Sequence, residues 1–298
     1  MAEKLTDQKK QQRIIIVTFL FFPLVSLLVF SYVPIVFNVF LSFTEWDGVN
    51  PLKLAASAGK LDALKNYKKI FGDPQYIKLF ANCGWYLLVA IPQLLLSFVL
   101  AVLVNGQFRG LGVFKAILVF PYLLNGVIVA AIFRTFFNDN GTLNTLLSIV
   151  GLDGARHSWL NDLKIVNPAI ASISIWRYYG MAFIMFFGAL QAIPAELYES
   201  AAIDGCSKWQ EIVNISVPFI KNVLFINVLL SISGSIQVFE IPYIVIGGNN
   251  GTSVPVIQIN RSMQDGRIGF AAAMSIVVFF VVVASVGLQK LLVKEEKE

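Results

Sequence analysis

The chain has 298 residues, of which 57% are hydrophobic and only 14% are charged. Soluble domains typically carry about 25% charged residues, so this composition excludes an ordinary soluble protein and predicts one that lies in a membrane. The formal net charge is +5, but no block of lysine and arginine is long enough to suggest a nucleic-acid partner. We interpret the positive excess as residues that flank membrane spans.

Six apolar segments are long enough to cross a lipid bilayer, which takes about 20 helical residues. They predict an all-α, polytopic membrane protein in which residues 1–298 form a single membrane domain. A polar N-terminal segment, residues 1–13, precedes the first span. The predicted spans are about residues 14–43, 79–104, 113–136, 165–190, 219–243 and 270–292.

Several of these spans contain residues that disturb a helix. Pro23 and Pro34 are expected to bend the first span, because proline removes a backbone hydrogen bond. Polar loops are expected between the third and fourth spans and, rich in glycine and asparagine, at residues 247–269. The third span is interrupted by Pro121, Asn125 and Gly126.

The stretch from Glu196 to Pro218 lies between two apolar spans but is too polar to cross a membrane itself. Pro194 suits the first turn of a helix, where its missing N–H would have no partner. Gly205 predicts the end of that helix, because glycine accepts the left-handed conformation. Ser207, with Gln210 three residues later, is a capping-box pattern for a second helix. The stretch therefore predicts two short helices joined by a glycine elbow at the membrane surface.

This stretch resembles the EAA loop in the membrane subunits of ABC importers. The family pattern is Glu-Ala-Ala, three residues, Gly, nine residues, Ile, one residue and Leu-Pro. Ser200 replaces an alanine and Val217 replaces the leucine, so two positions depart from it. The wider string from Gly188 to Gly205 is similar to the maltose-type sugar permeases. An ordinary amphipathic hairpin at the membrane surface is the alternative. The matching positions are Glu199, Ser200, Ala201, Gly205, Ile215, Val217 and Pro218.

The resemblance implies a type I ABC importer permease fold, with a core at residues 75–292 that contains the EAA loop at residues 191–218. In such proteins the loop docks into a cytoplasmic ATPase, which binds ATP and Mg. This chain lacks a G-x-x-x-x-G-K-[ST] phosphate loop, so we expect no cofactor in it. The implied partners are a second permease subunit in a heterodimer, two ATPase subunits and an extracytoplasmic solute-binding protein. The implied coupling residues are Glu199, Ser200, Ala201, Ala202, Asp204, Gly205, Ile215 and Pro218.

Six spans place both termini on the same side of the membrane. Lysine and arginine divide almost evenly between the two sides on these boundaries. Lys9, Lys10 and Arg13 lie next to the first span, where charge has most influence, and they favour a cytoplasmic N-terminus. The resemblance agrees, because an EAA loop must be cytoplasmic to meet an ATPase. We therefore expect a cell-membrane protein with both termini in the cytoplasm.

Polar residues inside the spans are costly in hydrocarbon, so they face protein or water. Arg177 lies near the middle of the fourth span, and Glu240 lies near one end of the fifth. Arg177 has two interpretations, because it could line a translocation pathway or form a structural ion pair with Glu240. Either arrangement satisfies a buried charge, and the sequence leaves both open.

A sugar pathway needs aromatic faces for the C–H surfaces of the sugar and polar groups for its hydroxyls. The fourth span supplies aromatic residues, and the fifth supplies hydroxyl and amide groups. In the maltose-type permeases these two spans form the substrate site, so the resemblance implies such a pathway here. The competing interpretation is helix packing through small residues and serines. The candidate pathway residues are Ser174, Trp176, Arg177, Tyr178, Tyr179, Gly234, Ser235, Gln237 and Glu240.

The predicted function is the permease subunit of an ATP-driven, binding-protein-dependent importer of a sugar or oligosaccharide, with no enzymatic activity. An ABC permease for another solute is the closer alternative. A gradient-driven secondary transporter is the more distant alternative, because it would require inverted repeats and a coupling carboxylate near the membrane midplane. No catalytic set can be assembled from the single histidine, His157, which we expect at the surface of a loop. Cys83 and Cys206 are placed on opposite sides of the membrane by the predicted topology, so they cannot form a metal site together.

Overall fold

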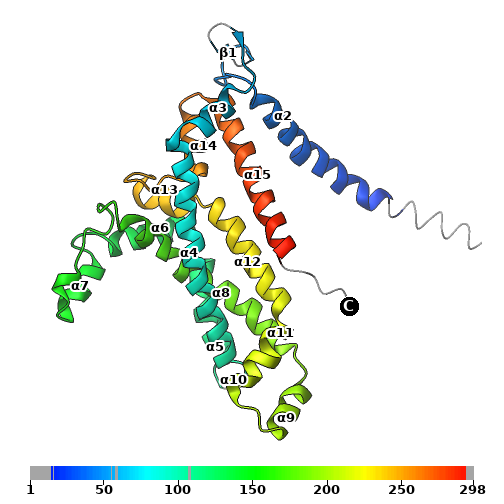
Figure 1. The fold of residues 1–298 in the computed structure, drawn as a ribbon, viewed down its shortest axis with the longest axis vertical. Helices are drawn as coiled ribbons and strands as arrows, with labels where there is room; N and C mark the ends of the chain where they lie inside the picture. Colours follow the sequence, from blue (N-terminus) through cyan, green and yellow to red (C-terminus); the bar gives the residue numbers. More distant parts are fainter. Residues whose placement is uncertain (1–14, 16, 55, 58–59, 107–108, 293–298) are drawn as a thin grey trace, which may run out of the picture. The chain divides into compact units, whose positions relative to one another are not determined.

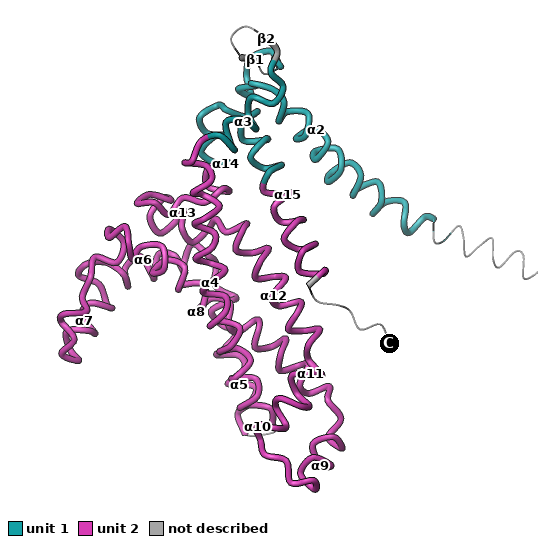
Figure 2. Tube along the Cα trace, viewed as in Figure 1, with its two compact units in different colours: residues 1–72, 259–277 teal, residues 73–258, 278–298 magenta. Residues whose placement is uncertain are grey.

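The computed structural model describes residues 15, 17–54, 56–57, 60–106 and 109–292. The chain folds into two compact units (Figure 2). Unit 1 comprises residues 1–72 and 259–277, and unit 2 comprises residues 73–258 and 278–298. The candidate site residues all belong to unit 2.

Helices form nearly all of the regular structure (Figure 1). The only sheet in the described part of the chain is a two-stranded antiparallel hairpin. In chain order the elements are the π-helix η1 (Leu28–Tyr32), α2 (Val33–Leu41), β1 (Ala56–Ser57), β2 (Lys60–Leu61), α3 (Lys65–Gly72), α4 (Pro74–Leu103), α5 (Leu111–Leu123), α6 (Gly126–Phe136), α7 (Thr142–Ile149), the 3-10 helix η2 (Asp153–Ala155), α8 (Val166–Gln191), α9 (Ala195–Ile203), α10 (Lys208–Glu211), the π-helix η3 (Ile212–Ser216), α11 (Val217–Phe219), α12 (Lys221–Ile236), α13 (Glu240–Ile246), α14 (Pro255–Gln264) and α15 (Ile268–Leu292).

Five helical segments of the described chain are long and apolar enough to cross a membrane. The pair α5 and α6 makes a sixth if the two helices together form one span. This agrees with the predicted all-α membrane protein of six spans. The five segments are Val17–Leu41, Pro74–Leu103, Val166–Gln191, Lys221–Ile246 and Ile268–Leu291.

Unit 1 holds the described first span, the hairpin, α3, most of α14 and the beginning of α15. The buried amide of Asn66 on α3 donates to the backbone oxygens of Ser42 and Thr44, at 3.0 and 2.8 Å. These bonds tie α3 to the chain that follows α2. In the same connection, the backbone N–H groups of Val49 and Asn50 donate to the Asp47 carboxylate and hold its pKa at about 2.

Helix α8 is the centre of unit 2, because α4, α5, α12 and α13 all contact it. Its N-terminal half contributes Val166, Ile170 and Ile173 to a buried cluster that also includes residues of α6 and α13. Its C-terminal half contributes Phe183 and Phe186 to a second buried cluster with residues of α4 and α5. The burial of α8 on several sides follows from an apolar sequence with no single polar face.

Two backbone contacts fix the neighbours of α8 at close range. The hydroxyl of Ser97 on α4 donates to the backbone oxygen of Tyr179 at 2.8 Å. A Cβ atom on Gly180 would lie 1.9 Å from the backbone oxygen of Leu118, so α5 can approach α8 only because this residue is glycine. Glycine at a helix contact allows such an approach.

The predicted third span is two helices rather than one interrupted helix, since α5 and α6 meet at an angle of 90°. Leu124 at the end of α5 is extended, with ψ of 140°. Asn125 then starts α6, because its side chain accepts a hydrogen bond from the Val127 N–H at 2.8 Å. An asparagine cap begins a new helix, and Pro121 in the last turn of α5 weakens the preceding one.

The predicted fifth span is also divided, into α12 and α13, with Gln237 at the end of α12. Two regions predicted as loops contain helices, namely α7 and α14. Helix α14 begins at Pro255, a residue that is well suited to the first helical position. In the first span, the π-helix η1 ends two residues before Pro34, and π turns and prolines are both sites where helices bend.

Candidate functional site

The predicted glycine elbow lies at one end of unit 2, where α9 and α10 follow α8 (Figure 1). Gly205 has φ of +76°, the left-handed conformation expected from the sequence. Its N–H donates to the Ala202 oxygen at 3.2 Å, and the Cys206 N–H donates to the Ala201 oxygen at 2.9 Å. This pair of bonds is the Schellman motif, so the predicted end of the first helix is confirmed.

The second helix of the elbow has the predicted capping box. The Ser207 hydroxyl accepts from the Gln210 N–H, and the Gln210 side chain accepts from the Ser207 N–H at 2.7 Å. One prediction was wrong, because Pro194 is the residue before the helix and not part of its first turn. Its ψ is 132°, which is extended rather than helical.

Side-chain contacts attach α9 to the segment that follows it. The hydroxyls of Tyr198 and Ser216 share a hydrogen bond of 3.0 Å. Among the predicted coupling residues, Ala201 is buried and Ile215 packs against the core cluster of the C-terminal half of α8. The exposed members of the set are Glu199, Ser200, Ala202, Asp204, Gly205 and Pro218.

The sequence reasoning missed the apolar surface of the elbow. Ile203 and Trp209 are 86% and 72% exposed, although the elbow is polar overall. Leu197 and Val213 are exposed beside them in the chain. Large exposed apolar residues on a polar segment are typical of a surface that contacts another protein or the membrane. The available signal was the presence of tryptophan and isoleucine in a stretch too polar to enter a membrane.

Three of the predicted pathway residues gather at the break between α5 and α6. The Arg177 guanidinium on α8 donates to the Glu240 carboxylate at the start of α13, with an N···O distance of 2.7 Å. The Arg177 side chain is 11% exposed, whereas that of Glu240 is 54% exposed. The guanidinium carbon also lies 5.2 Å from the centre of the Tyr178 ring. Of the two interpretations of Arg177, the ion pair with Glu240 is therefore formed. The Glu240 carboxylate remains partly exposed.

Two further residues of this cluster were not selected from the sequence. The ring of Tyr122, at the end of α5, packs edge-on against Tyr178 with 6.2 Å between centroids. A Cβ atom on Gly126 would lie 1.9 Å from the Glu240 carboxylate oxygen and 2.9 Å from the Arg177 nitrogen. The ion pair therefore rests directly on the first residue of α6. We define Tyr122, Gly126, Arg177, Tyr178 and Glu240 as the charge-pair cluster.

The remaining pathway candidates lie apart from this cluster. Trp176 packs against Phe133 of α6, with 5.4 Å between ring centroids, and Tyr179 packs against the core of the C-terminal half of α8. Ser174 is buried. On α12, Gly234 and Gln237 are exposed, whereas Ser235 is buried and bonds to Ile232 in its own helix. No atom lies within 4 Å of a Cβ placed on Gly234, so this glycine mediates no close helix contact among the described residues. The roles of these residues stay predictions.

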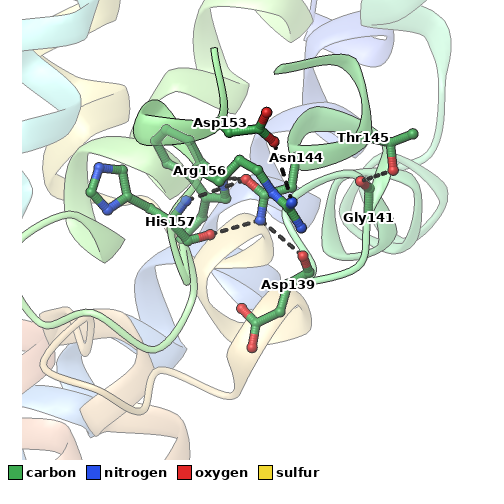
Figure 3. Close-up of polar contacts among 8 residues, drawn as sticks. Asp139, Gly141, Asn144, Thr145, Asp153, Arg156 and His157 are labelled. Carbon is green, nitrogen blue, oxygen red and sulfur yellow. Dashed lines mark hydrogen bonds and ion pairs between the residues drawn. The ribbon is translucent and has the colours of Figure 1, made fainter. Parts of the chain in front are cut away.

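The connection between α6 and α8 is held by one buried amide (Figure 3). Asn144 on α7 is 3% exposed. Its nitrogen donates to the backbone oxygens of Asp139 and His157, at 2.9 and 2.8 Å. Its oxygen accepts from the His157 N–H and from the Trp159 indole, at 3.3 and 2.8 Å. The side chain of His157 is exposed, as the sequence predicted. The polar loop beside Asn144 lines a shallow depression of about 440 Å³ that is open to the surface.

We expect Asn144→Ala to loosen this connection, because four hydrogen-bonding groups lose their partner. The loss should destabilise the segment by about 1–3 kcal/mol. Hydrogen exchange in residues 139–159 would measure it, with faster exchange confined to that segment. Asn140→Ala is the matched control, since the side chain of Asn140 is exposed. Equal exchange in both variants would show that Asn144 does not hold the loop.

Residues 86–297 match the family described as binding-protein-dependent transport system inner membrane component. The chain belongs to this family. A probable ABC transporter permease of Bacillus subtilis, YurN, is 30% identical over 291 residues, covering 95% of this chain and 98% of that protein. The multiple sugar-binding transport system permease MsmF of Streptococcus mutans is 27% identical over 269 residues, covering 89% and 90%. The predicted resemblance to sugar-type ABC importer permeases is thereby confirmed.

A solved structure of this transporter class shares the fold. The matched chain of a bacterial alginate ABC transporter, in complex with an alginate pentasaccharide-bound periplasmic protein, has a TM-score of 0.81 and 22% sequence identity. The match covers 96% of each chain. As a member of the inner membrane component family, this chain is a multi-pass membrane protein, and its predicted importer permease fold is confirmed.

Proposed function

We propose that this chain is the permease subunit of an ATP-driven, binding-protein-dependent ABC importer that moves a sugar or oligosaccharide across the cell membrane. The observation that carries the proposal is the capped elbow of residues 195–219 in a member of an importer family. Its Schellman end and capping box give it a defined shape. Exposed apolar side chains on it supply a docking surface for a partner.

The partner proposed for the elbow is a cytoplasmic ATPase subunit. Two such subunits would bind ATP and Mg, so the permease itself carries no cofactor and has no enzymatic activity. A second, homologous permease subunit would complete a heterodimer, and an extracytoplasmic solute-binding protein would deliver the substrate. With the elbow in the cytoplasm, both termini of the chain are cytoplasmic as well.

The substrate class is proposed from two kinds of support. Relatives of the chain include permeases named for multiple sugars and for trehalose and maltose, the latter 28% identical over 226 residues. In this chain, Tyr122 and Tyr178 offer aromatic surface next to hydrogen-bonding groups of Arg177 and Glu240. Aromatic rings present C–H-compatible faces, and charged groups form strong hydrogen bonds to hydroxyls.

In the proposed mechanism, movement of the elbow is transmitted through the helices to the charge-pair cluster. Closure of the ATPase subunits on ATP would displace α9 and α10. The elbow lies between α8 and α12 in the chain, and both helices contact α4, so the displacement would tilt them together. Tilting would alternate the pathway between outward-open and inward-open states.

The decisive test is affinity purification of the tagged chain in mild detergent, followed by uptake measurements in proteoliposomes. Recovery of an ATPase and a second permease, with sugar uptake that requires ATP and the binding protein, supports the proposal. Uptake of a non-sugar solute by the same assembly would support the permease role and reject the sugar. A chain that is recovered alone and transports solute with a proton gradient would contradict the proposed function.

Glu199→Lys is expected to reduce ATP-driven uptake at least about tenfold, because it reverses one charge on the face proposed to meet the ATPase. Glu199 is exposed on α9, so the variant should still fold and enter the membrane. Co-purification of the ATPase and uptake are the two measurements. Glu196→Lys, on the exposed first turn of the same helix, is the matched control. Equal loss in both variants would argue against a specific role for Glu199.

A further inference from the structure

We propose that Glu240 sets the charge selectivity of the permease. By pairing with Arg177 it keeps the charge-pair cluster electrically neutral, so the site accepts uncharged glycans and disfavours glycans that carry carboxylates. This inference rests on the proposed function and narrows its substrate class.

The first observation is the balance of charge along the membrane helices. Among α4, α5, α6, α8, α12 and α13, Glu240 is the only acidic residue. Arg177 therefore has no other counter-charge on these helices. The remaining basic residues lie toward the ends of their helices. They are Lys78, Lys115, Arg134 and Lys221.

The second observation is the unequal burial of the pair. Arg177 is 11% exposed and its Nε atom has no hydrogen-bond partner among the described residues. An uncompensated buried charge is strongly unfavourable, so Arg177 depends on Glu240. Glu240 is 54% exposed. The carboxylate is thus the member of the pair that an arriving solute meets first.

The third observation is that the carboxylate packs against the first residue of α6. The Glu240 oxygen that faces Arg177 also packs against Gly126, where any side chain would collide with it. Gly126 is the first residue of α6, and the positive end of a helix favours a carboxylate. The pair therefore lies at the 90° break between α5 and α6, where the absence of a side chain on Gly126 leaves room for the carboxylate.

These observations predict how the site distinguishes solutes. A neutral glycan can donate hydroxyl hydrogens to the exposed part of Glu240 and lie against Tyr122, which is 39% exposed. A glycan carboxylate at the same position would meet a like charge, which is unfavourable. Without Glu240, the site would hold the single positive charge of Arg177 and favour the anion.

The first experiment measures the charge of the cluster directly. Tyr122→Cys, in a Cys206→Ser background of the complete transporter, reacts with an anionic and a cationic methanethiosulfonate of similar size. Cys83 is buried and leaves this readout unaffected. Adding Glu240→Gln should raise the anionic-to-cationic rate ratio about five- to tenfold, and adding Arg177→Gln should lower it by a similar factor. The double substitution should restore the ratio of the Tyr122→Cys parent.

The second experiment measures selectivity, with maltotriose and trigalacturonate as probes. Saturation-transfer NMR on the purified transporter, without binding protein, should show preference for the neutral probe. Glu240→Gln should shift the preference about fivefold toward the anionic probe. Gly126→Ala keeps both charges but displaces the carboxylate, so it should weaken maltotriose binding. Gly188→Ala, on an open face of α8, should change neither probe.

The results separate this inference from the proposed function. If Glu240→Gln changes neither the rate ratio nor the preference while ATP-driven sugar uptake continues, the charge-selectivity proposal is overturned and the importer role stands. Equal binding of both probes to the unmodified transporter overturns it as well. A restored ratio in the double variant, together with the shifted preference in Glu240→Gln, supports it.

Discussion

Gly205→Pro should abolish ATP-driven uptake, with a loss of at least about 100-fold, while the protein still inserts into the membrane. Gly205 has φ of +76°, and proline is fixed near −65°. Proline also lacks the N–H that Gly205 donates to the Ala202 oxygen. The Schellman motif would be lost, and α10 would leave α9 in another direction. Uptake in proteoliposomes and retention of the ATPase during purification are the measurements.

Gly205→Ala tests the effect of the left-handed backbone conformation separately from any steric clash at this position. No atom lies within 4 Å of a Cβ at this position, so alanine meets no obstacle and only the left-handed conformation is penalised. That penalty is about 1 kcal/mol, and uptake should fall only a few-fold. Normal uptake by Gly205→Pro would contradict the coupling role of the elbow.

Gly180→Leu should destabilise the membrane domain by about 3 kcal/mol or more, the upper range for overpacked cores. A Cβ at Gly180 would lie 1.9 Å from the backbone oxygen of Leu118. A backbone atom cannot rotate aside as a side chain can, so α5 and α8 would have to separate. The midpoint of thermal unfolding in detergent would fall accordingly.

Gly188→Leu is the matched control for this change. Gly188 lies on the same helix, is exposed, and has no atom within 4 Å of a Cβ. Its unfolding midpoint should stay close to that of the unmodified protein. If both leucine variants unfold at the same temperature, the close contact between α5 and α8 does not limit stability.

The local geometry of the elbow was predictable because its signals are local. A glycine that must accept positive φ, and a serine followed by glutamine three residues later, act through the backbone of neighbouring residues. The same holds for the number of spans, which depends on the length of apolar segments. Gly205 and Ser207 therefore have the conformations that the sequence indicated.

The composition of the charge-pair cluster was not predictable in the same way. Helix α8 is buried on several sides, so its sequence gives no polar face that would separate Trp176 from Tyr178. Tyr122 belongs to the cluster because α5 ends beside α8, which is a tertiary contact. The sequence indicated an interruption of the third span at Pro121, Asn125 and Gly126. The 90° turn that places Gly126 against the ion pair could not be predicted, because Arg177 and Glu240 are far from it in the sequence.

The π-helix η3, at Ile212–Ser216, lies between α10 and α11. A π turn holds one residue more than the α-helical turn that it replaces, and each residue of an α-helix turns the chain by about 100°. Because the extra residue is accommodated within this one wider turn, the helices on either side keep nearly the same rotational positions. Removing one residue from the π segment would make the helix regular and leave the direction in which the elbow presents Trp209 nearly unchanged, whereas removing one residue from a regular α-helical turn would rotate the elbow by that angle. Two permeases that differ by one residue in this segment can therefore present the same face of the elbow to a partner.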